Sequence, residues 1–252
     1  MPHADVVLLF FAAVVGQALN AVAGGGSFLT FPMLLVAGVA PIEANATSTI
    51  ALWPGALASA WGYRRDFAAD RRTVIVLACV SIAGGLAGAL LLLATPEQQF
   101  RRLIPYLLGF ATLLFFVSDR MTLTIASRSR RQEAFFTALV GLIQFAVAVY
   151  GGYFGGGIGI MMLATFSLMD VGNIHSMNGL KALLGAVING AAVVTFIVAH
   201  LVVWQYAAPM IVASILSGYA SAKIARKIDP KRVRLAVVAV GIVLTSYFII
   251  HG

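Results

Sequence analysis

Charged side chains are scarce in this sequence. Of its 252 residues, 17 are Lys or Arg and 9 are Asp or Glu, which is 10% in all, whereas 61% are apolar. A soluble domain typically carries about 25% charged residues, so these charges are too few to cover a water-facing surface. Intrinsic disorder is excluded as well, because it requires low hydrophobicity and high charge. The composition therefore indicates a polytopic integral membrane protein.

Cysteine and the common catalytic motifs are also missing. Cys79 is the only cysteine, so no disulfide can form within the chain. The sequence contains no nucleophile elbow, nucleotide P-loop or HExxH metal motif. We therefore predict no catalytic residue, no cofactor and no metal site. Residues 1–5 lack the positive charge of a signal peptide, and we expect the first apolar segment to be retained as a helix.

Long apolar runs make up most of the chain. They are residues 5–23, 27–39, 42–62, 73–94, 103–118, 134–152, 158–169, 174–200, 206–225 and 233–250. Most approach the roughly 20 residues that a helix needs to cross a bilayer, but segments 27–39 and 158–169 are short. Because the runs are continuously apolar, they predict helices and not the alternating strands of an outer-membrane barrel.

The sequence contains an internal duplication. The glycine triplet at 24–26 recurs at 155–157, and each half reads long helix, glycine cluster, short helix, long helix, loop and two helices. We predict a first repeat at 1–119, a basic linker at 120–133 and a second repeat at 134–252. The expected fold is all-α and polytopic, with two five-segment halves related by an inverted repeat.

The positive charges indicate the topology. Fourteen of the 17 basic residues fall in three stretches, 64–72, 120–131 and 223–234. Since basic loops stay in the cytoplasm, each half should cross the membrane an odd number of times. Five crossings per half give opposite orientations and a site at the bilayer midplane. In the alternative, the two short segments re-enter and eight helices cross. Basic residues confined to turns favour contact with the lipid bilayer and exclude a nucleic-acid partner.

The glycine clusters form the first candidate site. Broken helices in a membrane are tolerated only where they line a cavity or lie inside protein. The short helix after each cluster has free N–H groups and a dipole that favours an anion. We therefore expect both clusters to contribute to one anion-binding site, with close helix packing as the alternative. These substrate-binding candidates are Gly24, Gly25, Gly26, Ser27, Gly155, Gly156 and Gly157.

Polar residues near the start of the third segment of each half form the second candidate group. They are Asn45, Thr47, Ser48 and Thr49 in the first half, and Asn178 and Lys181 in the second. Lys181 aligns with Thr49 and is the only basic residue between 134 and 222. A charge inside a membrane helix usually serves a function, so we expect Lys181 to contact an anionic substrate. The alternatives are a snorkelling lysine or a structural pair with Glu43 or Asp170.

Coupling to an ion gradient has fewer candidates. A desolvated Glu43 carboxylate could take up a proton, and His175 could titrate near neutral pH. The coupling ion, H⁺ or Na⁺, is left open by the sequence. Further polar residues could form hydrogen bonds between helices. They are Gln17, Asn20, Gln144, Tyr150 and Asn189.

Several motifs together resemble the sulfite exporter TauE/SafE family of bacterial membrane permeases, over nearly the whole chain. They are Ala-Val-Ala-Gly-Gly-Gly-Ser-Phe-Leu-Thr-Phe-Pro-Met-Leu-Leu at 21–35, Ala-Thr-Ser at 46–48, Tyr-Arg-Arg at 63–65, Gly-Gly-Leu-Ala-Gly-Ala at 84–89, the second glycine motif at 155–159, and Ile-Asp-Pro-Lys-Arg-Val-Arg at 228–234. The chain departs from the family pattern at 161–163, where Met-Met-Leu replaces the usual proline-containing stretch.

The resemblance implies a secondary transporter that moves a small sulfur-containing anion, such as sulfite or an organosulfonate, across the inner membrane by alternating access. A non-transporting membrane enzyme or assembly factor is the alternative, as is a permease for a different anion or cation. A homodimer is one option for the oligomeric state, which the sequence leaves open.

Overall fold

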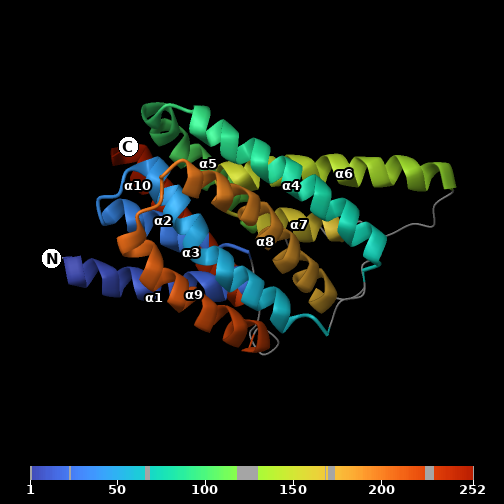
Figure 1. Ribbon diagram of the computed structural model, residues 1–252, viewed down its shortest axis with the longest axis horizontal. Coiled ribbons are helices and arrows are strands. Elements are labelled where there is room, and N and C mark those ends of the chain that lie inside the picture. The colour runs from blue at the N-terminus through green and yellow to red at the C-terminus, as the bar shows by residue number, and fades with distance from the viewer. Residues whose placement is uncertain are drawn as a thin grey trace.

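The described part of the chain is built from helices. The computed structural model describes residues 2–22, 24–65, 69–117, 130–167, 169, 174–224 and 230–251. Its helices are α1 (Pro2–Val22), α2 (Ser27–Val36), α3 (Pro41–Gly62), α4 (Arg71–Ala94), α5 (Glu97–Val117), α6 (Arg130–Tyr153), α7 (Ile158–Phe166), α8 (Ile174–Val198), α9 (Trp204–Ile224) and α10 (Pro230–His251). Each predicted apolar segment corresponds to one of them, and the two short segments are the short helices α2 and α7 (Figure 1).

The helices suit a membrane. Within the described residues, three stretches are long and apolar enough to span one by length and composition: Ala4–Ala21, Arg71–Ala94 and His175–Val198. Ser27–Val36, Ala138–Tyr153 and Val237–Ile250 are shorter apolar helices. Large apolar side chains such as Leu90, Leu216 and Ile250 are exposed, and exposed apolar surface on this scale marks contact with lipid or another protein. The chain is therefore a polytopic membrane protein.

Glycines with left-handed backbone conformations interrupt the helical path in both halves of the chain. Gly24 has a φ of 83°, Gly155 of 78° and Gly157 of 83°. Residues with a Cβ rarely adopt such angles, whereas glycine does so without steric cost. The chain therefore breaks between α1 and α2 and again between α6 and α7, as the glycine triplets predict.

Long helices of one half pack against the other half. Helix α4 contacts α6 and α8, while α9 contacts α1 and α3. Helix α3 also packs on α8, and α5 packs on α10. Glycines permit these close approaches, since a Cβ at Gly218 would overlap the backbone of Gly55, and one at Gly85 would lie 2.7 Å from the Ile188 carbonyl oxygen.

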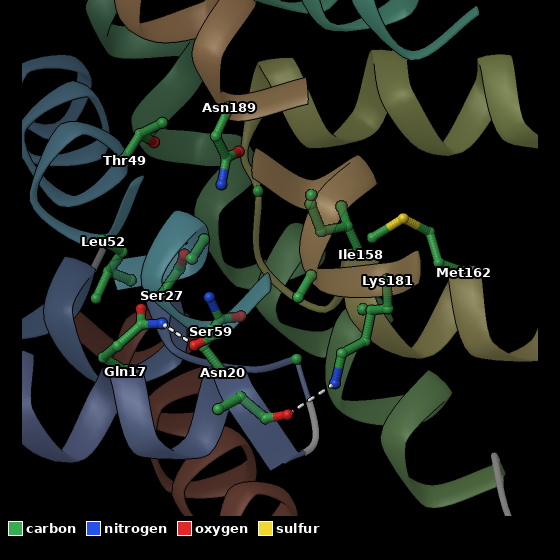
Figure 2. Close-up of a pocket in the computed structure, with 17 residues that line it drawn as sticks. Gln17, Asn20, Ser27, Thr49, Leu52, Ser59, Ile158, Met162, Lys181 and Asn189 are labelled. Carbon is green, nitrogen blue, oxygen red and sulfur yellow. Dashed lines mark hydrogen bonds between the residues drawn. The ribbon is translucent and has the colours of Figure 1, made fainter. Parts of the chain in front are cut away.

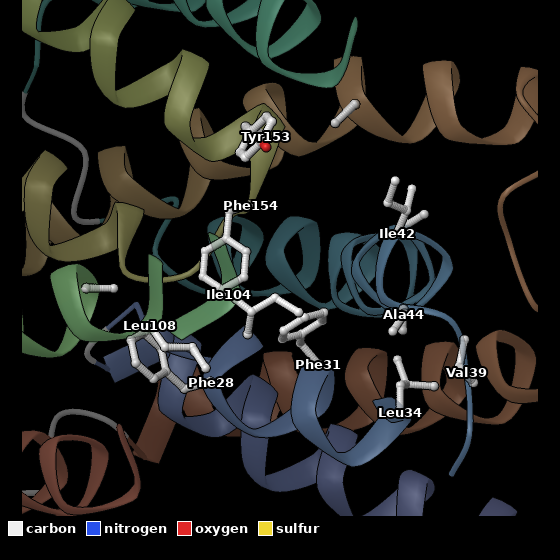
Figure 3. Packing of buried hydrophobic residues seen from close by; sticks show 14 of the residues in the cluster. Phe28, Phe31, Leu34, Val39, Ile42, Ala44, Ile104, Leu108, Tyr153 and Phe154 are labelled. Carbon is white, nitrogen blue, oxygen red and sulfur yellow. The ribbon is translucent and has the colours of Figure 1, made fainter. Parts of the chain in front are cut away.

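The short helix α2 is enclosed by protein. Phe28, Phe31 and Leu34 are fully buried on it, in a cluster with residues of α5 such as Ile104 (Figure 3). The Phe31 ring meets that of Phe154 edge to face, with 5.5 Å between centroids. This packing fixes the position of the α2 N-terminus, which faces the candidate site.

Candidate functional site

The two glycine breaks meet in space. A Cβ placed on Gly24 would lie 2.5 Å from the Cα of Gly159, and one on Gly159 would lie 2.5 Å from the Cα of Gly24. These positions are more than 130 residues apart in the sequence, in different halves of the chain. The expectation that the two glycine segments contact each other is thereby confirmed.

The short helices begin at this meeting point with free amides. Among the described residues, the first backbone N–H groups to reach a carbonyl are those of Phe28 in α2, which donates to Gly25 (3.2 Å), and Ile160 in α7, which donates to Gly157 (3.1 Å). Gly24 and Gly155, just before these helices, both line a cavity. Free amides at a helix N-terminus favour an anion.

The cavity lies between α1, α2, α3, α7 and α8, and its volume is about 30 Å³. Its described lining residues are Gln17, Asn20, Ala21, Gly24, Ser27, Thr49, Leu52, Ala56, Ser59, Gly155, Ile158, Gly159, Met162, Lys181, Ala182, Gly185 and Asn189. Measured in this way, one water occupies about 10–15 Å³. The cavity therefore has room for about two waters, or for one small, compact ligand.

Lys181 supplies the charge at this cavity. It lies on α8, and its side chain is only 3% exposed, so a basic group is buried inside a membrane protein. The amine donates hydrogen bonds to the Ala21 carbonyl oxygen at 3.2 Å and to Asn178 Oδ1 at 2.8 Å. Figure 2 shows Lys181 on one side of the cavity and Gln17 and Ser59 on the other. The lysine thus bridges α8 to the C-terminal end of α1, next to the first glycine break.

Only some of the predicted site residues line the cavity. They are Gly24, Ser27, Thr49, Gly155 and Lys181. Asn178 is absent from the lining but positions the lysine through its side-chain oxygen. Glu43 and His175 are half-buried and are also absent from the described lining. Asp170 lies outside the described residues.

The other predicted residues are not among the described lining residues, and three of them form hydrogen bonds to other segments. Asn45 donates to the Tyr153 carbonyl oxygen at 3.0 Å, and Thr47 accepts from the Val203 amide at 3.0 Å. Ser48 shares a 2.6 Å hydrogen bond with Thr30. Gly25, Gly26, Gly156 and Gly157 belong to the two breaks, and none of them is among the described lining residues. The hydrogen bonds of Asn45, Thr47 and Ser48 join α3 to neighbouring segments.

Helical periodicity accounts for most lining residues that the sequence did not single out. Leu52, Ala56 and Ser59 follow Thr49 on one face of α3, because side chains three or four apart are neighbours on a helix. Gly185 follows Lys181 in the same way on α8, as does Asn189, which the sequence singled out only as a polar residue on a membrane helix. Counting along the helices from Thr49 and Lys181 would have found them. Gln17 and Asn20 stood out only as polar residues on a membrane helix.

A second hollow of about 440 Å³ lies at the opposite end of α2. Leu35, Val36 and Ile104 contribute apolar surface to it, and Arg101 is the charged residue among its described lining. Arg101 is exposed, unlike Lys181. The described residues contain no group of three or more His, Cys, Asp or Glu side chains that could hold a metal ion.

Known proteins match this chain over nearly its whole length. The family profile described as "Sulfite exporter TauE/SafE" matches residues 8–248. A "Probable membrane transporter protein" of Haemophilus influenzae is 25% identical over 242 residues, which cover 96% of this chain and 93% of the relative. A "Probable membrane transporter protein ORF9" of Sinorhizobium sp is 30% identical over 233 residues, covering 89% of this chain and 87% of the relative. No solved structure matches the chain.

Proposed function

We propose that this chain, which belongs to the sulfite exporter TauE/SafE family, moves a small sulfur-containing anion such as sulfite across the bacterial inner membrane. Its relatives are described as probable membrane transporter proteins, and it is a membrane transporter. The observation that carries the finer proposal is the buried Lys181 amine at a cavity where two helix breaks meet.

The chemistry of the cavity favours an anion. Lys181 is the titratable side chain among the described lining residues, which include no carboxylate. The N-terminal amides of α2 and α7 add donors and the positive ends of two helix dipoles. A cation would be repelled by the lysine and would find no carboxylate in the described lining, so a cation permease is disfavoured.

The size of the cavity narrows the range of possible substrates. A volume of about 30 Å³ suits an oxyanion of a few heavy atoms and leaves little room for a long organic chain. Sulfite fits this description better than an extended organosulfonate does. A larger substrate would require α3 or α8 to move outward.

In each half, one long helix packs against helices of the other half, and this arrangement supports alternating access. Helix α9 packs on α1 and α3, and its counterpart α4 packs on α6 and α8. This correspondence is what two related halves around one central site would produce, and inverted repeats of this kind rock about a fixed binding site in many transporters. We infer that α3 and α8, which contact each other and both line the cavity, move relative to each other during transport.

The proposed inverted topology makes a prediction for labelling. Cysteines introduced at Arg64 and Arg226 should react only with a reagent that reaches the cytoplasmic face, because basic loops stay inside. The Cys79→Ser background removes the native thiol. Labelling of the two positions from opposite sides of intact inner-membrane vesicles would exclude the five-plus-five arrangement.

Flux into proteoliposomes tests the proposed function. Purified protein should carry radiolabelled sulfite down its gradient, at rates well above those of protein-free liposomes. Imposed pH and Na⁺ gradients identify the coupling ion. A membrane enzyme or assembly factor would give no flux with sulfite, thiosulfate or sulfonates, and this result would refute the proposal.

A further inference from the structure

We propose that the anion is bound and carried in its monoprotonated form, with its O–H group donating a hydrogen bond to Gln17 Oε1. The inference rests on the proposed anion-binding function and specifies the chemical species. One end of the substrate would carry the charge toward Lys181, and the other would present a hydroxyl. In this scheme the coupling proton travels on the substrate and no protein group needs to bind it.

Gln17 has an unsatisfied acceptor at the cavity. Its side chain is fully buried, and its Oε1 atom has no hydrogen-bond partner among the described residues. Leaving a buried acceptor without a donor is unfavourable, so such groups are rare and call for an explanation. A ligand in the cavity, which Gln17 lines, can supply the missing donor.

The hydrogen-bond network fixes which way the Gln17 amide points. Gln17 Nε2 donates to Ser59 Oγ at 3.2 Å. The Ser59 hydroxyl has one proton, and the Gly55 and Gly218 carbonyl oxygens are its acceptors, at 3.0 and 3.1 Å. Ser59 therefore has no proton left for Gln17. If the amide were rotated by half a turn, its oxygen would face Ser59 Oγ, which has no proton to offer, and its NH₂ group would have no acceptor. The amide therefore keeps its orientation, and Oε1 is the free acceptor.

Two further lining residues offer acceptors. Thr49 uses its hydroxyl proton on the Asn45 carbonyl oxygen at 2.8 Å, which leaves only lone pairs for a ligand. Asn189 Oδ1 is buried without a partner in the described residues. Figure 2 shows Thr49 and Asn189 together at one end of the cavity and Lys181 at another. The lining thus offers donors at Lys181 and the helix N-termini, and acceptors at Gln17, Thr49 and Asn189.

A hydroxyl on the substrate explains these acceptors better than a metal cation does. A separate cation and an anion would both have to fit in about 30 Å³, where about two waters fit. The cation would also approach the buried Lys181 amine. A single monoprotonated oxyanion satisfies both regions with one molecule of one negative charge.

Methanesulfinate is the matched probe for this inference, because a methyl group replaces the hydroxyl of hydrogensulfite at equal charge. Binding is measured by calorimetry on the purified full-length protein. At weakly acidic pH we expect hydrogensulfite to bind about tenfold more tightly than methanesulfinate. As the pH rises and sulfite loses its proton, its apparent affinity should fall more than that of methanesulfinate. The methanesulfinate series corrects for any titration of Lys181, the titratable group that lines the cavity.

Gln17→Met removes the acceptor while keeping the length of the side chain, and it should abolish the preference for hydrogensulfite. Gln144→Met is the matched control. Gln144 is also fully buried, donates to a serine (Ser81, 2.9 Å) and has a free Oε1, but it does not line the cavity. The control variant should keep the preference.

Three results would overturn the inference. Equal affinities for the two anions in the wild-type protein, at every pH, would contradict it even if Gln17→Met fails to fold. A preference that survives Gln17→Met would do so as well, as would sulfite binding that requires Na⁺. Each of these results leaves the proposed function standing if both anions bind. Failure of both anions to bind would refute the proposed function itself.

Discussion

Replacing Lys181 with glutamine is expected to abolish anion transport while the protein still folds. A charged hydrogen bond to a ligand in a buried site contributes about 2–5 kcal/mol, so anion affinity should fall at least 30-fold. Glutamine can still donate to the Ala21 carbonyl oxygen, which accepts a hydrogen bond from Lys181. The expected loss of affinity is measured by sulfite binding, the loss of transport by proteoliposome flux, and normal folding by thermal stability in detergent.

Arg101→Gln provides the control for lost positive charge. Arg101 lines the second hollow, at the C-terminal end of α2. It is not among the described residues that line the cavity at the glycine breaks. We expect this variant to bind sulfite as the wild-type protein does. Lys181→Gln that folds normally and binds sulfite with wild-type affinity would exclude a substrate role. A loss confined to yield and stability would assign Lys181 to a structural pair.

Gly24→Ala should destabilise the protein strongly. Its Cβ would lie 2.5 Å from Gly159 Cα, and the backbone at Gly24 has a φ of 83°. Overpacking typically costs about 1–3 kcal/mol, and left-handed backbone costs a residue with a Cβ roughly 1–2 kcal/mol. We therefore expect a loss of about 3 kcal/mol, measured as reduced yield and a lower unfolding temperature in detergent.

Gly38→Ala separates the two causes. Gly38 has the same φ of 83°, but a Cβ there would meet nothing within 4 Å. It should therefore lose only the conformational part, about 1–2 kcal/mol. If both alanine variants are equally stable, the close contact between the two glycine breaks contributes nothing, and the shared site loses its structural basis.

The sequence was sufficient to predict the helices and the place where the two halves meet. Continuous apolar runs specify membrane helices because lipid leaves no alternative partner for the backbone, so all ten segments correspond to helices. The glycine triplets predicted both the breaks and their contact. Lys181 was found because a lone charge in such a segment is costly.

Details of the lining depended on three-dimensional packing. Asn45 and Ser48 were as good candidates as Thr49 from the sequence, yet they form hydrogen bonds to Tyr153 and Thr30. The direction in which each side chain points depends on how α3 is rotated against its neighbours, and this rotation cannot be read from residue types alone. The sequence marks Gln17 only as a polar residue, whereas the free acceptor on its side chain depends on Ser59, whose proton goes to the Gly55 and Gly218 carbonyl oxygens.

The position of a bound anion tests the account most directly. Selenite is a chemical analogue of sulfite, and its selenium can be located by anomalous scattering in crystals of the full-length protein. We predict one peak in the cavity, within hydrogen-bonding reach of the Lys181 amine and next to Gly24 and Gly155. A peak confined to the hollow at Arg101, with none at Lys181, would contradict the proposed site.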